Sequence, residues 1–200
     1  MSWMNFSDAE EQNSSDLIPH KTPVKVTMKI RAGGYNDPSQ GWTGGYATQA
    51  DSGAVYLDCE FTVIGGKFNK RKVWSLIGLY SPKGPKWESM GRSFIRAALE
   101  SARGVAPNDT SELAGKARQI KGFGDLDGLE FAAFVEIQKA EPGTSYSDKN
   151  VIQTVIPFTH KDYTALMSGQ GEVTTTPTPS AAASSLGRSA KPSSAPAWAS

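Results

Sequence analysis

The strictest pattern in this chain is the alternation of apolar and polar side chains over residues 54–64. Successive side chains of a β-strand point to opposite faces, so this period of two places the apolar ones together on one face. They are Val55, Leu57, Cys59, Phe61 and Val63. Gly65 and Gly66 follow as a turn signal, and residues 72–80 are expected to return as the second strand of a hairpin. The chain should therefore contain an antiparallel sheet with one buried face.

Other segments complete a mainly β pattern. Residues 24–31 and 129–138 also alternate and are predicted strands, and residues 150–158 are expected to supply a last strand. Residues 87–103 instead carry apolar side chains at steps of three and four, which predicts an amphipathic helix. Residues 33–53 combine glycine with aromatic side chains and are expected to form a long loop or an irregular hairpin.

The order of these elements indicates a fold. Five strands with a helix between the third and the fourth follow the order of the five-stranded OB barrel, a small antiparallel barrel. We therefore expect a mainly β protein, a five-stranded OB-like antiparallel barrel with an inserted helix and a disordered C-terminal tail. Other small antiparallel barrels and sandwiches share this order, and barrel closure is not visible in a sequence.

Composition divides the chain into three regions. Residues 1–20 carry four acids and no Lys or Arg, and we expect them to form a flexible acidic arm. Residues 21–168 hold the patterned segments and should form the barrel domain. Residues 169–200 are dominated by Ser, Pro, Ala and Thr, which bury too little apolar area to offset the entropy of ordering, so a disordered tail is expected.

The sequence offers no signal for export or membrane insertion. Its first 20 residues lack the basic start and the apolar stretch of a signal peptide, and no run reaches the roughly 18 apolar residues of a membrane span. Cys59 is the single cysteine, so an internal disulfide is excluded. We expect a cytoplasmic protein without a membrane partner, in which Cys59 is a small buried hydrophobe rather than a nucleophile.

Catalytic signatures are missing from the sequence. It has no G-x-x-x-x-G-K-[ST] phosphate loop, no H-E-x-x-H zinc motif and no G-x-S-x-G nucleophile elbow. His20 and His160 lack zinc-site spacing with Cys59. Asp125 and Asp127 have oxygen atoms that suit Mg²⁺ or Ca²⁺, but the rest of a calcium loop is missing and acids in turns are far commoner. We expect no catalytic residue, no cofactor and no metal site.

The net charge of +1 hides a strongly basic centre. Residues 61–121 contain twelve Lys and Arg against four Asp and Glu, whereas residues 1–20 and 122–172 are acidic. A basic segment between acidic ones indicates an anionic partner. The charge alone is equally compatible with a solvated hairpin and helix.

Basic residues near the tip of the expected hairpin are interleaved with aromatic ones. Single-stranded nucleic acid needs cations along its phosphates and flat rings on which its bases stack. The candidate phosphate contacts are Lys67, Lys70, Arg71 and Lys72. The candidate stacking residues are Trp42, in the glycine-rich segment, and Trp74 and Tyr80, which share one parity of the returning strand. The alternative, that these aromatic side chains belong to the core, stays open.

The expected helix 87–103 adds two features. Trp87 lies on its apolar face and is expected in the core. Arg92, Arg96 and Arg103 lie within about 40° of one another on a wheel of about 100° per residue, opposite that face. They are either a second track for nucleic acid or a solvated stripe, and we favour the stripe.

Several segments resemble a known group of proteins. They are residues 52–61, the hairpin through Trp74 and Ile77, residues 90–95, and residues 126–131 with the pattern L-x-G-x-x-F. They look like small conserved proteins of phages, prophages and related bacteria that are described as distantly similar to OB-fold single-stranded DNA-binding proteins. The resemblance implies a role in phage or bacterial DNA replication or recombination. Bacterial single-strand binding proteins typically end in an acidic tip that recruits partners, and this chain departs from them because no acid follows Glu172.

Together these features predict a non-catalytic single-stranded DNA-binding protein. RNA satisfies the same chemistry, so the choice between DNA and RNA stays open. The alternative is a structural or adaptor domain of phage origin that binds protein through the same surface. A protein partner on the C-terminal tail and a homo-oligomer are both compatible with the sequence. Binding dominated by phosphates would weaken steeply with ionic strength, whereas a protein interface would respond less.

Overall fold

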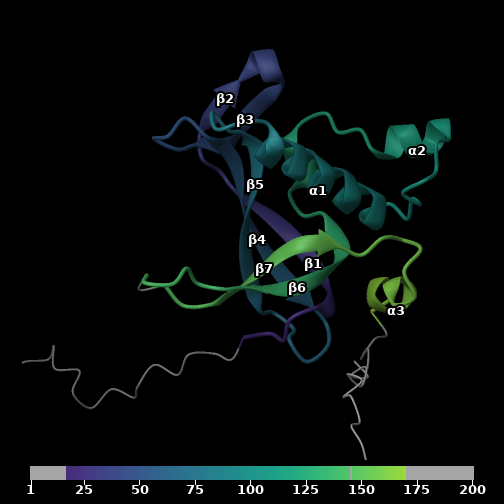
Figure 1. Ribbon diagram of the computed structural model, residues 1–200. Helices are drawn as coiled ribbons and strands as arrows, with labels where there is room; N and C mark the ends of the chain where they lie inside the picture. Colours follow the sequence, from purple (N-terminus) through teal and green to yellow (C-terminus); the bar gives the residue numbers. More distant parts are fainter. Residues whose placement is uncertain (1–16, 145, 170–200) are drawn as a thin grey trace, which may run out of the picture.

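The alternating segment forms the central strand β4, Val55–Ile64, in which buried and half-buried residues alternate along its whole length. The computed structural model describes residues 17–144 and 146–169. Over these ranges the protein is mainly β, with an antiparallel sheet that curls into a half-barrel and is accompanied by a few helices (Figure 1).

The described residues form seven strands and three α-helices. The strands are β1 Thr22–Arg31, β2 Tyr35–Asp37, β3 Trp42–Gln49, β4 Val55–Ile64, β5 Lys72–Tyr80, β6 Glu130–Gln138 and β7 Lys149–Val155. The helices are α1 Lys86–Ala102, α2 Glu112–Ala117 and α3 Tyr163–Met167. The sequence predicted five strands, and the two additional ones, β2 and β3, lie in the glycine-rich segment 33–53.

β2 and β3 form a hairpin whose sequence has no regular alternation of apolar and polar residues. Gly34 and Gly45 have φ angles of 79° and 70°, and the Gly34 amide donates to the Gly45 carbonyl at 2.8 Å. The Asn36 side chain accepts a hydrogen bond from the Gly45 amide at 2.9 Å. Glycine adopts this left-handed backbone at little steric cost, so the hairpin depends on glycine geometry rather than on alternating burial.

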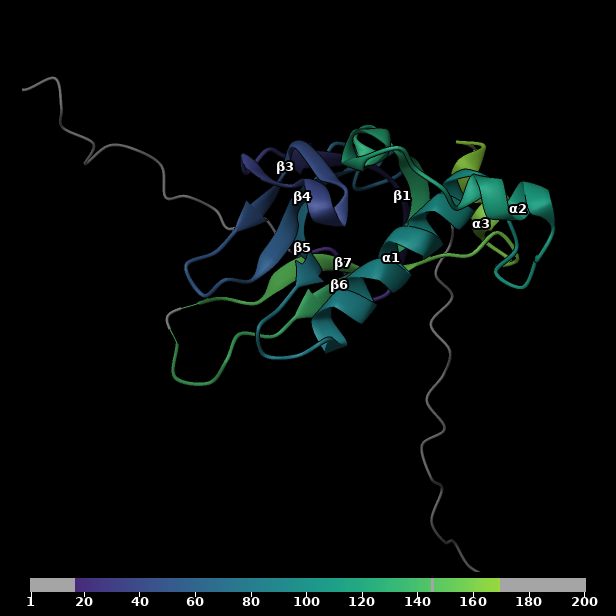
Figure 2. The same ribbon diagram turned by 90° about the horizontal axis from the view of Figure 1, so that it is seen from above.

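Five strands follow one another around the curled sheet in the order β5-β4-β1-β6-β7, each antiparallel to the next. β3 pairs with the beginning of β4, and β2 pairs with β3. Two antiparallel steps separate β1 from β5 and two separate it from β7, so β5 and β7 are parallel. They meet where the Ile152 amide of β7 donates to Ser75 Oγ of β5 at 2.9 Å, and Figure 2 shows the two strands next to each other.

Helix α1 packs against the sheet and contributes side chains to the core. Its Phe94 ring lies 6.1 Å from both Phe61 of β4 and Phe131 of β6, in edge contacts. The helix also comes very close to β5, because a Cβ atom on Gly91 would lie 1.9 Å from the Gly78 carbonyl oxygen. Only glycine at position 91 allows this approach.

The main core includes a residue from the segment that the sequence analysis treated as an arm. Ile18, which the sequence assigns to the arm, is fully buried in the main core. Residues 1–16 and 170–200 lie outside the described residues, and so do the predictions of a flexible arm and a disordered tail that fall on them. No helix among the described residues has both the length and the apolar character to cross a membrane.

Candidate nucleic-acid interface

The outer side of β5 carries Trp74 and Leu76, whose exposed fractions are 47% and 53%. Their neighbours Val73 and Ile77 point the other way and are buried in the core. The sequence left open which face of this strand is buried, and in the structure Trp74 lies on the solvent side. We refer to Lys72, Trp74 and Leu76 as the β5 face.

Tyr80 is also exposed, but it does not continue the row that contains Trp74. The pairing of β4 with β5 shifts register between Val55 and Tyr56, which places Tyr80 opposite Val55 and Gly78 opposite Tyr56. A bulge of this kind interrupts the alternation on which the shared parity of Trp74 and Tyr80 rested.

The Trp87 ring limits the β5 face at its Gly78 end. A Cβ atom on Gly78 would lie 2.4 Å from this ring, and the ring centroid is 6.1 Å from that of Tyr56. Trp87 is half-buried against the outer side of the sheet, whereas the sequence placed it in the core. Gly78 has no side chain on the outer side of β5, so the Trp87 indole can occupy the space that a side chain would fill there.

The turn between β4 and β5 holds the predicted cluster of cations, which we call the basic tip: Lys67, Lys70, Arg71 and Lys72. Lys70 has a φ of 66°, and its amide donates to the Val63 carbonyl at 2.8 Å. Lys67 Nζ lies 5.6 Å above the Phe68 ring centroid. Lys72 Nζ pairs with Glu60 Oε1 at 2.8 Å across the strands. The turn thus brings the four residues together, with two of the ammonium groups held at defined positions.

Two carboxylates on β4 lie beside the β5 face. Register puts Glu60 opposite Trp74 and Asp58 opposite Leu76. Hydrogen bonding from Lys72, with a further hydrogen bond from the Trp74 side chain, holds the pKa of the Glu60 carboxyl below its usual value. The Glu60 carboxylate therefore stays ionised at neutral pH, and its charge is offset by a neighbouring cation.

Two cations of β1 complete the same surface, and the sequence analysis missed them. Arg31 Nη1 lies 3.3 Å from Asp58 Oδ2, and Lys29 stands opposite Glu60 in the register of β1 with β4. Their alternation within residues 24–31 was visible, since Lys29 and Arg31 occupy the polar parity of that strand. What the sequence lacked was the pairing that sets β1 beside β4.

Trp42 lies apart from the β5 face. It is the first residue of β3, stands opposite Asp37 of β2, and packs half-buried against the core. β3 pairs with the first residues of β4, whereas the basic tip follows its last residue. β1 runs away from the basic tip, from Lys25 opposite Ile64 to Arg31 opposite Asp58, and β2 follows it, so Trp42 and the basic tip lie toward opposite ends of the sheet.

The connection between β6 and β7 presents another aromatic side chain. Tyr146 is 80% exposed, and the base of the connection is held by Asp148, which accepts from Lys139 Nζ at 2.6 Å and from the Ala140 amide at 3.0 Å. This connection leads into β7, the neighbour of β5. No periodic pattern in the sequence singled out Tyr146.

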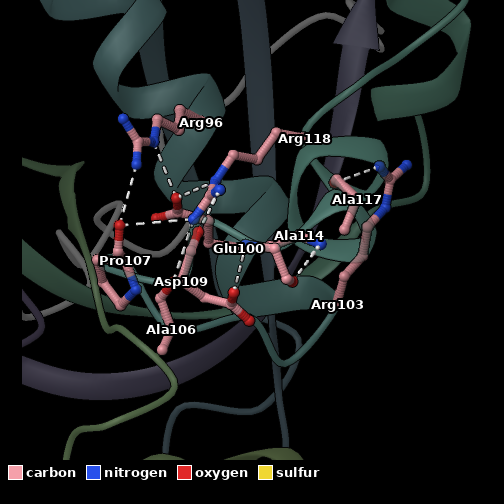
Figure 3. A network of polar contacts seen from close by, with 10 residues as sticks. Arg96, Glu100, Arg103, Ala106, Pro107, Asp109, Ala114, Ala117 and Arg118 are labelled. Atoms are coloured by element: carbon pink, nitrogen blue, oxygen red, sulfur yellow. Dashed lines mark hydrogen bonds and ion pairs between the residues drawn. The ribbon is translucent and has the colours of Figure 1, made fainter.

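The arginines of α1 have structural partners that the sequence did not predict (Figure 3). Arg96 Nε and Arg118 Nε both donate to Glu100 Oε1, at 2.8 and 2.6 Å. Arg103 Nη1 donates to the carbonyls of Ala117 and Gln119 at 2.6 and 3.0 Å. Arg92, Arg96 and Arg103 are all exposed, as the favoured solvated stripe predicts, and Arg96 and Arg103 in addition fasten the segment after α1 to the helix.

The two turn acids have backbone partners. Asp127 Oδ1 accepts from the Ile30 amide at 2.7 Å, and Asp125 Oδ2 accepts from the Lys121 amide at 2.7 Å. Within residues 17–144 and 146–169, no three His, Cys, Asp or Glu side chains are grouped so that they could hold a metal ion. Cys59 is buried, and burial raises the pKa of its thiol.

Comparison with protein-family models and with curated proteins gave no match for this sequence. The mainly β half-barrel, and the aromatic and basic surface on β5 and β1, therefore carry the functional argument.

Proposed function

We propose that this protein binds single-stranded DNA, without catalysis, across the outer side of β4 and β5. The observation that carries the proposal is the half-exposed indole of Trp74, which stands between Lys72 and Leu76 on the solvent side of the sheet. Exposed rings beside cations are what single-stranded nucleic acid needs, because bases stack on the rings while phosphates pair with the cations.

The order of the strands supports an OB-like reading. Taken as five strands, β1, β4, β5, β6 and β7 follow one another around the sheet as 3-2-1-4-5, and the third and fifth strands approach each other through Ser75 and Ile152. α1 lies between the third and fourth strands, and the β2–β3 hairpin elaborates the first connection. OB barrels bind oligonucleotides on their second and third strands, flanked by the first and last connecting loops. Those positions here are β4, β5, the β2–β3 hairpin and residues 139–148.

The charge balance of this surface favours an anion. Asp58 and Glu60 are each matched by a cation at 3.3 and 2.8 Å, whereas Lys29, Lys67 and Lys70 add positive charge beyond these pairs. A phosphate chain can use that surplus without leaving a carboxylate unpaired. A role in phage or bacterial DNA replication or recombination, which the resemblance implies, is part of the same proposal.

One observation favours a second candidate function. Leu76 is 53% exposed beside Trp74, and an exposed apolar pair also suits a protein partner. An adaptor domain that binds protein through the β5 face is therefore the alternative.

Salt dependence tests the proposal. Lys67→Gln combined with Lys70→Asn removes two cations of the basic tip, and Asn tolerates the left-handed backbone at position 70, where φ is 66°. Affinity for fluorescent oligo-dT, measured between about 0.05 and 0.2 M salt, should show a log–log slope shallower by about 1.4, or about 0.7 per lost phosphate contact. A matched control, Lys83→Gln with Lys161→Gln, removes two exposed cations outside this surface and should leave the slope unchanged.

Equal slopes for the two double variants would remove the basic tip from the interface. Absence of oligo-dT binding at low salt would refute the proposed function and leave the adaptor alternative. RNA binding is read in the same assay with oligo-U.

A further inference from the structure

The Glu60 carboxylate lies within the surface proposed for nucleic acid. It belongs to the solvent side of β4, and the register of the two strands puts it directly opposite Trp74 of β5. A negative charge at this position repels phosphates, so on electrostatic grounds alone it would weaken the binding of a polyanion. The contacts of Glu60 indicate a second role.

Glu60 is held by two side chains of β5. Lys72 Nζ lies 2.8 Å from Glu60 Oε1, and the Trp74 side chain donates a hydrogen bond to the same carboxyl group. The indole N–H is the only donor of a tryptophan side chain, so this contact fixes the N–H edge of the ring beside β4. One carboxylate therefore neutralises its charge on Lys72 and at the same time orients the Trp74 ring.

Two other carboxylates on this side of the sheet are also ion-paired between neighbouring strands. Asp58 pairs with Arg31 at 3.3 Å, and Glu130 of β6 pairs with Lys25 of β1 at 2.7 Å. Their side chains are 27% and 47% exposed, more than the 18% of Glu60. Among the described residues, only Glu60 also accepts a hydrogen bond from an indole. The other two carboxylates therefore serve as internal controls.

We propose that Glu60 is a positioning residue, which holds the Trp74 indole in the orientation in which the ring stacks on a base. The inference deepens the proposed function and rests on it. A side chain that rotates freely loses conformational entropy when a ligand immobilises it, and for one ring this loss weakens affinity by about twofold to fivefold. A ring that is already held avoids this loss, and Lys72 reduces the repulsion that the carboxylate would exert on phosphates.

The two roles of the carboxylate predict opposite results. If Glu60 were only a surface anion, every substitution that removes its charge would tighten the binding of DNA. If Glu60 positions the ring, the substitution must also keep an acceptor for the indole N–H. Glu60→Gln keeps a side-chain oxygen that accepts this hydrogen bond, whereas Glu60→Ala has none. The two variants carry the same charge, so the difference between them reports positioning.

Affinity for fluorescent oligo-dT is measured with full-length chains at about 0.1 M salt. Glu60→Gln should bind at least as tightly as the wild type, and Glu60→Ala should bind about twofold to fivefold more weakly than Glu60→Gln. The control pair Glu130→Gln and Glu130→Ala makes the same two changes at a carboxylate that contacts a cation alone, and these two variants should bind equally.

A Trp74→Phe background tests whether the effect passes through the indole. Phenylalanine keeps a flat ring but has no N–H, so the difference between Gln and Ala at position 60 should disappear in this background. The packing of residue 60 against the ring is retained in both backgrounds. A general effect of the substitution on the sheet would therefore persist, and urea unfolding establishes that every variant is folded during the titration.

The ring is also observed without nucleic acid. The indole N–H signal of Trp74 in the proton NMR spectrum is assigned by its loss in Trp74→Phe. Its exchange with water should be slow in the wild type and in Glu60→Gln, and faster in Glu60→Ala, because a hydrogen-bonded N–H exchanges only when the bond opens. Equal exchange in the three proteins would overturn the positioning.

The inference and the proposed function fail differently. If the wild type binds oligo-dT and Glu60→Ala binds as tightly as Glu60→Gln, Glu60 is only a surface anion and the proposed function stands. A difference that persists in the Trp74→Phe background likewise overturns the positioning alone. If the wild type binds no oligo-dT, the proposed function is refuted, and the role of Glu60 in base stacking is refuted with it.

Discussion

The Trp74→Ala variant allows the contribution of Trp74 to base stacking to be measured separately from its contribution to folding stability. A fully buried Trp costs about 3–5 kcal/mol of stability when it is truncated to Ala. The Trp74 side chain is already 47% exposed, so about half of that cost, roughly 1.5–2.5 kcal/mol, is expected. In a domain of this size, that loss lowers the melting temperature by about 3–10 °C. The loss of one stacked base should weaken oligo-dT binding by about 1–3 kcal/mol, or about fivefold to 150-fold in Kd.

Both quantities are measured on the same variants. Anisotropy of labelled oligo-dT gives Kd, and unfolding in urea gives stability and shows which fraction is folded during the titration. Trp74→Phe keeps a flat ring and should recover most of the affinity. Leu99→Ala truncates a core side chain of α1 that is 1% exposed, so it should lower stability without weakening the binding of the folded protein.

One result refutes the reasoning. If Trp74→Ala lowers the free energy of unfolding but the folded variant binds oligo-dT as tightly as the wild type, Trp74 serves packing alone. The β5 face would then lack its stacking ring.

Two further predictions concern the frame that carries this surface. Gly91→Ala should destabilise the protein by about 1–3 kcal/mol or more in urea unfolding, because its Cβ would lie 1.9 Å from the Gly78 carbonyl oxygen. Gly115→Ala, in helix α2, should instead stabilise it by about 0.5–1 kcal/mol, because nothing lies near a Cβ atom at this position. Equal effects of the two substitutions would contradict the close approach of α1 to β5. Burial alone would raise the pKa of Glu100, but hydrogen bonds and charges of Arg96 and Arg118 lower it below the usual value. The ionised carboxylate thus contributes stability that is present above about pH 4.5 and is lost as pH falls through the lowered pKa, so the wild type should lose more stability on acidification than Glu100→Gln, and parallel pH profiles would contradict this.

Local patterns in the sequence were sufficient for the elements whose burial is periodic. β4 follows from strict alternation, and α1 from apolar steps of three and four, because both patterns act within one element. For residues 33–53 the sequence left two alternatives, a long loop or an irregular hairpin, and the structure has the hairpin. The sequence could not choose between them because positive φ angles at Gly34 and Gly45 specify the hairpin, and glycine carries no apolar signal.

Contacts between distant residues explain what the sequence could not provide at the interface. Lys29 and Arg31 join the surface only through the register of β1 with β4. Arg118 reaches Glu100 across 18 positions of the chain, and this contact adds a structural network that the expected stripe of arginines did not reveal. The shift of register near Tyr80 likewise depends on its partner strand.

The arrangement of charge also restricts how a nucleic acid strand would lie on this sheet. Side by side, β1 offers Lys29 and Arg31, β4 offers the two carboxylates, and β5 offers Trp74 and Leu76. The carboxylates of the middle strand are paired with cations and offer phosphates no positive charge, so under the proposed function the backbone would follow the cations of β1 or of the basic tip. Bases must then turn toward β5, where the exposed ring and the leucine lie. Carboxylates between them accept hydrogen bonds from exocyclic amino groups, which cytosine and adenine have and thymine lacks. Under the proposed function, the surface would therefore offer a phosphate path, a stacking ring and a row of acceptors within three neighbouring strands.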